Sequence, residues 1–214
     1  MRPDTSEPSE KPINSQGAAR RSIVIGASTG GVEALYTVLS RFPEDCPPTF
    51  VVQHMRPGYV ESFVAGLNKA CSANVVLAQD RQIPRAGCIY VAPAGASHMN
   101  LTAHPVLTMR LINGPAVHGH RPAVEPLFLS AARLRPPPVA ALLTGMGRDG
   151  AEGLLAIRRA GGHTIAQDEA SSVVYGMPGS ARELNAADQI LPLSFIAAAL
   201  LRMATQPSTN GSGR

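Results

Sequence analysis

Ser28 lies in a glycine-flanked turn that could present a nucleophile. Residues 26–30 have the spacing G-x-S-x-G and directly follow the apolar run 23–25. Flanking glycines allow a sharp turn from a strand into a helix, which leaves the serine hydroxyl exposed at the end of the strand. A phosphate or dinucleotide cradle is a second interpretation, although the chain lacks the lysine of a P-loop here and does not match G-x-G-x-x-G. A third interpretation is that Ser28 only caps the helix that follows.

Two more polar residues follow apolar runs in the same manner. His54 comes shortly after the run 49–52, and Asp149 lies in the glycine-rich turn after the run 139–143. A nucleophilic serine needs a base to accept its proton and a carboxylate to orient that base, and these residue types supply those roles. Their chain order differs from the order Ser, Asp, His of the α/β-hydrolases. The structural alternatives are a buried, hydrogen-bonded histidine and a turn or helix-capping aspartate.

Backbone N–H groups beside Ser28 could complete such a site. Thr29 follows the serine, and Met146 lies in the turn that also contains Asp149, so their N–H groups could form an oxyanion hole. Packing in the core is the alternative for Met146. The other five histidines show no spacing typical of metal ligands, and we expect neither a metal nor a cofactor. They are scattered across loops and strand ends, so a surface or loop histidine is the default interpretation for each: His98, His104, His118, His120 and His163.

Apolar runs alternate with helical patterns along most of the chain, which predicts strands and helices in alternation. The predicted strands are 23–25, 49–52, 74–78, 89–91, 139–143, 163–166 and 188–191, and the predicted helices are 32–40, 59–69, 123–134, 151–160 and 193–203. This rhythm predicts an α/β fold: a doubly wound, mostly parallel sheet with helices on both faces and one antiparallel hairpin, formed by 99–101 and 106–111, at an edge. Ligands bind at the carboxyl edge of such sheets, where Ser28, His54 and Asp149 would meet.

Composition and charge restrict the class of protein. With 214 residues, 44% of them apolar and 16% charged, the chain is typical of one globular domain. We place this domain at residues 21–205, between a disordered tail at 1–20 and a flexible tail at 206–214. The formal charge of +4 comes with scattered arginines, which does not favour nucleic acid and permits an acidic protein partner. Three widely spaced cysteines predict free thiols, and no signal peptide or membrane-spanning run is visible, so we expect a cytoplasmic protein.

Four longer segments resemble the catalytic domain of the bacterial chemotaxis protein-glutamate methylesterases of the CheB type. They are IGASTGG at 25–31, VVQHM at 51–55, LLTGMGRDG at 142–150 and AQDEASSVVYGMPG at 166–179. Residues 120–122, with the helix after them, are also similar, and the matches keep their order across residues 22–193. Because four long segments in the right order do not arise by chance, the sequence is identified as a member of this family.

The resemblance implies an enzyme and its substrate. It implies hydrolysis of γ-glutamyl methyl esters on the cytoplasmic helices of chemoreceptors, and in many members the deamidation of specific glutamines there. By motif, Ser28 is then the nucleophile, His54 the general base and acid, and Asp149 the carboxylate that orients the histidine. Thr29 and Met146 border this site.

The resemblance also bears on partner contacts and regulation. Arg121, before a predicted helix, could contact the acidic receptor surface or simply be solvated. Family members commonly carry an N-terminal phospho-receiver domain that covers the active site until it is phosphorylated. About twenty residues precede the first predicted strand here, so we expect that regulation to be absent from this chain. Three explanations fit the missing receiver domain. The chain is a stand-alone enzyme, a piece of a longer chain, or a member of a chemosensory-like pathway that controls something other than flagella. His118 stands where relatives often have Asn.

The alternative function is a non-catalytic regulatory module that binds a receptor or a nucleotide on the same fold. Such a module would keep the fold but would not need the three reactive residue types together. Their joint presence favours the hydrolase, and covalent labelling of Ser28 by a fluorophosphonate would separate the two functions.

Overall fold

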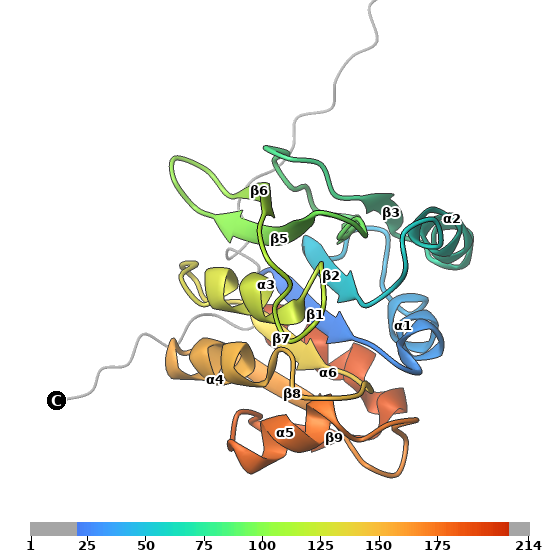
Figure 1. The fold of residues 1–214 in the computed structure, drawn as a ribbon, viewed down its shortest axis with the longest axis vertical. Helices are drawn as coiled ribbons and strands as arrows, with labels where there is room; N and C mark the ends of the chain where they lie inside the picture. Colours follow the sequence, from blue (N-terminus) through green and yellow to red (C-terminus); the bar gives the residue numbers. More distant parts are fainter. Residues whose placement is uncertain (1–20, 206–214) are drawn as a thin grey trace, which may run out of the picture.

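Nine strands and six helices make up the part of the chain that the structure describes, residues 21–205 (Figure 1). The structure is a computed structural model, and the tails predicted at 1–20 and 206–214 lie outside the described residues. The strands are β1 Ile23–Ala27, β2 Thr49–Gln53, β3 Asn74–Leu77, β4 Cys88–Val91, β5 Ser97–Thr102, β6 Thr108–Asn113, β7 Val139–Leu142, β8 His163–Gln167 and β9 Gln189–Leu191. The helices are α1 Gly31–Leu39, α2 Val60–Ala70, α3 Val124–Ala131, α4 Ala151–Arg159, α5 Met177–Glu183 and α6 Leu193–Thr205.

Seven of the strands form one parallel sheet. Its order is β3-β4-β2-β1-β7-β8-β9, and every neighbouring pair runs parallel. β1 is buried along its whole length, as its apolar run predicts. The predicted hairpin is present as β5 and β6, which pair antiparallel with each other in a separate two-stranded sheet. The α/β class is therefore confirmed, while the hairpin lies against α3 instead of extending the edge of the main sheet.

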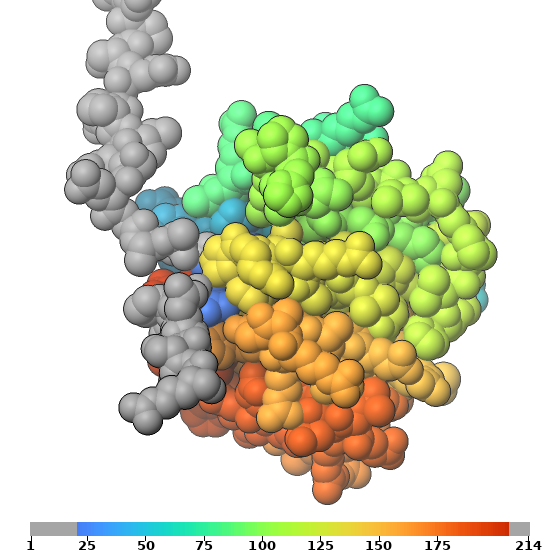
Figure 2. Space-filling model, turned by 90° about the vertical axis from the view of Figure 1, so that its left-hand side faces the viewer, coloured from blue at the N-terminus to red at the C-terminus, as the bar shows by residue number. Residues whose placement is uncertain are grey.

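Helices cover both faces of the parallel sheet. Ile23 and Ile25 of β1 belong to a core formed with α1, α2 and α6, whereas Val24 belongs to a second core with α3, α4, α5 and the hairpin. Successive side chains of a strand point to opposite faces, so this one strand supplies both cores. The layer that covers this second face of the sheet extends from the hairpin across α3 and α4 to α5, as the space-filling view in Figure 2 shows.

The chain order reverses between β1 and β7. After β1, the strands β2, β3 and β4 lie on one side, and the chain then returns to β7 on the other side and continues to β8 and β9. Loops diverge at such a switch point, which leaves a crevice outside the carboxyl ends of the strands where ligands bind. Ser28 follows β1, His54 follows β2, and Asp149 lies in the loop from β7 to α4. The fold therefore brings all three predicted residues to this edge.

The cysteines form no disulfide. Cys46, Cys71 and Cys88 are free thiols, as predicted. Burial raises the pKa of Cys46 and of Cys71 to about 11, so both thiols stay protonated at neutral pH. Among residues 21–205, no helix combines the length and the apolar character that a membrane crossing requires.

Candidate active site

Backbone hydrogen bonds fix the turn at Ser28. The N–H of Ser28 donates to the carbonyl of Thr144, just beyond β7 (3.0 Å), and its own carbonyl accepts from the N–H of Gly31 (2.8 Å). Gly30 has a φ of +78°, in the left-handed region that glycine adopts without strain, and it is the N-cap residue of α1. Since Gly30 takes that position, capping is not the role of Ser28. The predicted strand-to-helix turn is present, and Ser28 is 9% exposed in it.

A buried glutamine joins the turns that hold Ser28 and His54. The side-chain amide of Gln53 donates to the carbonyl of Ser28 (2.9 Å) and to that of His54 (3.0 Å). Gly31 leaves room for this side chain, because a Cβ at that position would collide with Gln53 Oε1. No role for Gln53 was predicted from the sequence. A polar residue at the end of an apolar strand, directly before His54, was the available signal.

His54 and Asp149 form a buried, hydrogen-bonded pair. His54 Nε2 lies 2.8 Å from Asp149 Oδ2, and the two side chains are 6% and 1% exposed. Because an ionised carboxylate only accepts hydrogen bonds, Nε2 carries the proton in this pair. The other ring nitrogen, Nδ1, is buried and has no hydrogen-bond partner among the described residues. In the neutral ring, Nδ1 is therefore the free base, and its lone pair is available for a proton.

Three donors hold the carboxylate of Asp149. Besides His54, the N–H of Val124 donates to Oδ2 (2.6 Å) and the N–H of Glu125 donates to Oδ1 (3.0 Å). Both N–H groups belong to the first turn of α3, where the helix dipole favours negative charge. Burial alone would raise the pKa of Asp149, but the hydrogen bonds from His54, Val124 and Glu125 outweigh it, and the pKa lies below its ordinary value. Asp149 therefore caps α3 and binds His54 at once, as a charged acceptor.

Ser28 and His54 lie at the ends of adjacent strands. Ala27 and Gln53 are partners in the β1–β2 register, and the N–H of His54 donates to the carbonyl of Ala27 (3.1 Å). Within residues 21–205, the hydroxyl of Ser28 is hydrogen bonded to neither ring nitrogen of His54. Such contacts are often long without substrate and tighten when it binds. The structure thus places Ser28 next to a bonded pair of His54 and Asp149.

His120 covers one face of the His54 ring. The two ring centroids lie 3.6 Å apart, and the ring planes differ by 12°. Burial lowers the pKa of His120, and the charge of His54 lowers it further, while the charge of Asp149 opposes this. Reciprocal backbone hydrogen bonds with Val117 hold His120 in the loop before α3 (2.9 and 3.0 Å). The loop position is as predicted, but the sequence analysis missed that His120 packs on His54. Its place in the loop before α3 was the available signal.

Thr29 and Met146 lie at the surface beside Ser28. Met146 is 68% exposed, which excludes core packing as its role, and Thr29 is exposed too. Gly145 approaches the serine so closely that a Cβ there would be 2.6 Å from Ser28 Cβ. Val173 packs over the turn that follows Ser28 and is itself 69% exposed. Met146 and Val173 therefore give the surface next to Ser28 an apolar character.

Arg121 ties two loops together. Its Nε donates to the carbonyl of Gly95 and its Nη1 to the carbonyl of Gly114, both at 2.8 Å. The side chain is nevertheless exposed. Neither of the two predicted alternatives, receptor contact or simple solvation, included this structural role. A receptor contact through the remaining N–H groups of Arg121 stays a prediction.

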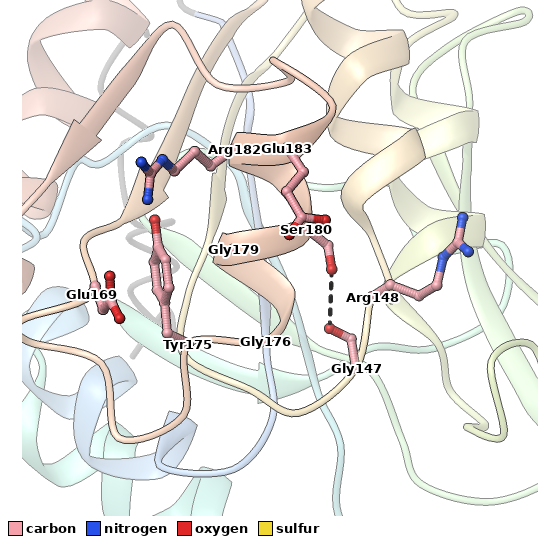
Figure 3. A pocket seen from close by; sticks show the side chains of 9 residues that line it. All are labelled: Gly147, Arg148, Glu169, Tyr175, Gly176, Gly179, Ser180, Arg182 and Glu183. Carbon is pink, nitrogen blue, oxygen red and sulfur yellow. Dashed lines mark hydrogen bonds between the residues drawn. The ribbon is translucent and has the colours of Figure 1, made fainter.

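A cleft of about 870 Å³ opens beside the turn that carries Met146 (Figure 3). At this cleft, the hydroxyl of Ser180 in α5 donates to the carbonyl of Gly147 (3.5 Å). Figure 3 shows the side chain of Arg182 extending toward the hydroxyl of Tyr175. Two arginines and two glutamates balance the formal charge of the lining. The lining residues are Gly147, Arg148, Glu169, Tyr175, Gly176, Gly179, Ser180, Arg182 and Glu183.

Comparison with known proteins decides the family. The family model described as CheB methylesterase matches residues 23–200. This chain belongs to the CheB methylesterase family. A relative from Agrobacterium fabrum, named protein-glutamate methylesterase/protein-glutamine glutaminase, is 45% identical over 206 residues, which cover 95% of this chain and 59% of the relative. A relative from Caulobacter vibrioides, named protein-glutamate methylesterase/protein-glutamine glutaminase 1, is 47% identical over 184 residues, which cover 86% of this chain and 54% of the relative.

A solved structure extends the comparison to the fold. The crystal structure of the Thermotoga maritima CheB methylesterase catalytic domain matches with a TM-score of 0.82 and 34% sequence identity, and the match covers 86% of this chain and 98% of that domain. This chain therefore has the fold of a CheB catalytic domain. It spans a little over half the length of the two relatives described above. The resemblance carried by the four sequence segments is confirmed for family and fold.

One group of side chains in this CheB-family chain has the residue types of a metal site. Ligand atoms of His118, Glu125 and Asp149 lie within 4.8 Å of one another. The carboxylates are already engaged, because Asp149 accepts from three donors and Glu125 Oε2 accepts from the N–H of Gly150 (3.0 Å). We therefore assign no metal to this group. The sequence analysis missed Glu125, although its position three residues before Phe128, on the apolar side of the helix, was an available signal.

Proposed function

We propose that this chain is a serine esterase that hydrolyses γ-glutamyl methyl esters on the cytoplasmic domain of a chemoreceptor. The observation that carries the proposal is the 2.8 Å hydrogen bond between His54 and Asp149 beside Ser28, at the switch point of the sheet. The names of the relatives, protein-glutamate methylesterase/protein-glutamine glutaminase, supply the substrate class and a second reaction, the deamidation of receptor glutamines.

In the first step, His54 acts as the general base. Its Nε2–H donates to Asp149, which leaves Nδ1 to take the proton from the hydroxyl of Ser28 as the serine oxygen attacks the ester carbonyl. The ring then carries a positive charge, and the ionised carboxylate of Asp149 stabilises it. The lowered pKa of Asp149 supports this role, because the carboxylate stays charged throughout the neutral range.

In the second half of the reaction, His54 acts as the acid and then again as the base. Protonated Nδ1 gives its proton to the methoxide as the C–O bond breaks, so methanol leaves and the glutamyl group stays on Ser28 as an ester. Water, deprotonated by Nδ1, attacks this ester and releases the glutamate carboxylate and the free serine. For a glutamine substrate the same steps release ammonia in place of methanol.

Thr29 and Met146 supply the oxyanion hole in this proposal. Thr29 follows Ser28 in the chain, and Met146 follows Gly145, which packs against Ser28. Their N–H groups would bind the attacked carbonyl oxygen, which gains negative charge in the transition state. The close approach of Gly145 to Ser28 supports it, because that approach carries the Met146 turn to the serine. The exposed apolar side chains of Met146 and Val173 would contact the receptor helix that presents the ester.

Covalent labelling tests the proposal against a non-catalytic module. A fluorophosphonate reacts with a serine only where a base activates it, and mass spectrometry identifies the modified residue. We expect labelling of Ser28 in the full chain, none in the Ser28→Ala variant, and unchanged labelling in Ser40→Ala, the same change at an exposed serine at the end of α1. Absence of labelling in the unaltered protein would favour the module that binds a receptor or a nucleotide without catalysis.

A further inference from the structure

Glu125 is a buried carboxyl group that the reaction above does not use. It lies in the first turn of α3 and is 7% exposed. The N–H of Gly150 donates to its Oε2 (3.0 Å), and the N–H of Gly153 also interacts with the carboxylate. Gly150 is the N-cap residue of α4. Glu125 therefore binds the N-terminus of α4, and it does so from the neighbouring helix.

Asp149, which precedes α4, caps α3, and Glu125, which belongs to α3, binds the N-terminus of α4. Asp149, just before α4, accepts the N–H groups of Val124 and Glu125 in α3, while Glu125 accepts the N–H of Gly150, the residue after Asp149. Glycine at position 153 permits the close approach, since a Cβ there would lie 3.3 Å from Glu125 Oε1. The two segments are thus joined by reciprocal hydrogen bonds, and the carboxylate that binds His54 lies at their centre.

We propose that Glu125 is a positioning residue for the reaction at Ser28. Through the Gly150 N–H it fixes the loop that carries Asp149, and its negative charge adds to that of Asp149 in stabilising the protonated His54 ring. Opposite charges attract more strongly in a buried site than in water, so a second carboxylate lowers the free energy of the transition state in which this ring is charged. The inference rests on the proposed function of Ser28, His54 and Asp149.

The charge on Glu125 changes in the neutral pH range. Burial, and after it the charge of Asp149, raise the pKa of Glu125 from its ordinary 4.5 to about 7, although the hydrogen bond from the N–H of Gly150 opposes this shift. Glu152 adds a small further repulsion, but it is exposed and paired with Arg148 (2.8 Å). The titratable and charged groups on the segments around Glu125 are Asp149 and Glu152 at the start of α4, His118 and His120 in the loop before α3, Arg133 after α3, His98 on β5, and His54 beyond Asp149. Glu125 is therefore mostly neutral below about pH 7 and mostly charged above it.

The test compares rates of fluorophosphonate labelling of Ser28 between about pH 5 and pH 9. The reagent needs an activated serine but no receptor, so the result does not depend on the substrate. Glu125→Gln removes the charge and keeps an oxygen for the Gly150 N–H, whereas Glu125→Ala removes both. Glu61→Gln, the same change in the exposed first turn of α2, is the matched control.

We expect the ratio of unaltered to Glu125→Gln labelling rates to rise from near one at low pH to roughly five- to tenfold at high pH. Glu125→Ala should label more slowly at every pH, and Glu61→Gln should follow the unaltered protein. A flat ratio would overturn the inference, because the charge of Glu125 would then have no effect on the reaction. Identical profiles of the Gln and Ala variants would also overturn it, because the hydrogen bond to the Gly150 N–H would then not position the Asp149 loop. If the Ala variant does not fold, the Gln variant decides alone.

Failure of the proposed function would give a different experimental result from failure of the inference on Glu125. If Ser28 of the unaltered protein is labelled but a methylated receptor releases no methanol, the proposed substrate is wrong and the inference on Glu125 is still decided by the labelling ratio. If Ser28 of the unaltered protein is not labelled at any pH, the proposed function and the inference are both contradicted.

Discussion

The rings of His54 and His120 lie face to face, with their centroids 3.6 Å apart. This contact covers the face of a ring whose edge is already bound to Asp149, so His54 is fixed in two directions. Burial, together with the charge of His54, lowers the pKa of His120 from its ordinary 6.5, so His120 is neutral at neutral pH. A neutral ring can stack on the charged His54 ring, whereas a protonated one would repel it.

The first prediction concerns this stacked pair. His120→Phe keeps a flat ring and should retain most of the esterase activity, while His120→Ala should lower kcat about three- to tenfold, because aromatic pairs contribute about 0.5–1.5 kcal/mol. The Phe variant cannot become charged, so its activity should also fall less than that of the unaltered protein once the pH drops below the lowered pKa of His120. Steady-state kinetics over pH check both points. Equal activity of the Ala and unaltered proteins would contradict the role assigned to His120.

Replacement of Asp149 by Asn should separate catalysis from stability. The amide cannot neutralise protonated His54, and it leaves only one oxygen for the N–H groups of Val124 and Glu125. We expect kcat to fall about 1,000- to 10,000-fold and the free energy of unfolding to fall by about 1–2 kcal/mol. Kinetics and chemical denaturation measure the two effects.

Asp188→Asn is the matched control for this variant. Asp188 also accepts a backbone N–H, that of Thr164 (2.9 Å), and it pairs with Arg158 (2.8 Å), but it lies at the β8–β9 side of the sheet. The Asp188→Asn variant should have a lower free energy of unfolding than the unaltered protein and the same kcat. If the two Asn variants lost activity to the same extent, the assigned role of Asp149 would not hold.

Gly145→Ala should displace Ser28. The new Cβ would lie 2.3 Å from Met177 Sδ and 2.6 Å from Ser28 Cβ, both closer than real Cβ atoms approach, and a tight 3.2 Å from Ser28 N. Because a small misplacement of a reacting group can be costly, we expect kcat to fall about 100-fold. Gly114→Ala, where the nearest atom would be 3.7 Å away, should be tolerated. Equal kinetics of the two variants would show that the approach of Gly145 to Ser28 does not matter.

Stability should depend on pH through Glu125. Its pKa is about 7 in the folded protein, because burial and then the charge of Asp149 raise it from the ordinary 4.5. As the pH rises from about 4.5, the unfolded chain releases this proton first, so the contribution of Glu125 is complete below 4.5 and is lost as the pH rises through 7. Relative to Glu125→Gln, the unaltered protein should lose up to roughly 3 kcal/mol over this window. A pH-independent difference in the free energy of unfolding would contradict the raised pKa.

Much of the fold and part of the site follow from local sequence patterns. The apolar runs before Ser28, His54 and Asp149 predicted buried parallel strands, and glycines at positions 26 and 30 predicted the sharp turn after the first of them. The parallel sheet then required that these strands end at one edge. For this reason the meeting of the three residues could be predicted without a structure.

The residues that the sequence analysis missed act through tertiary contacts. His120 and Glu125 reach the site because the N-terminus of α3 packs against the Asp149 loop. Their positions in the sequence place them near or on the buried side of α3 but do not show which residues they contact. The hairpin was predicted, but its placement was not, since its apolar face with Met99 and Met109 suits either a sheet edge or the helix layer. The loop contacts of Arg121 depend on two backbone carbonyls, which sequence patterns do not reveal.

Methanol release from a methylated chemoreceptor fragment tests the central claim most directly. The purified full chain should release methanol, the Ser40→Ala control should match it, and Ser28→Ala should fall at least about 1,000-fold while keeping the same melting temperature. Release by Ser28→Ala at the rate of the unaltered protein, or no release by the unaltered protein from any methylated receptor fragment of the same cell, would contradict the assignment of Ser28 as the nucleophile of a protein-glutamate methylesterase.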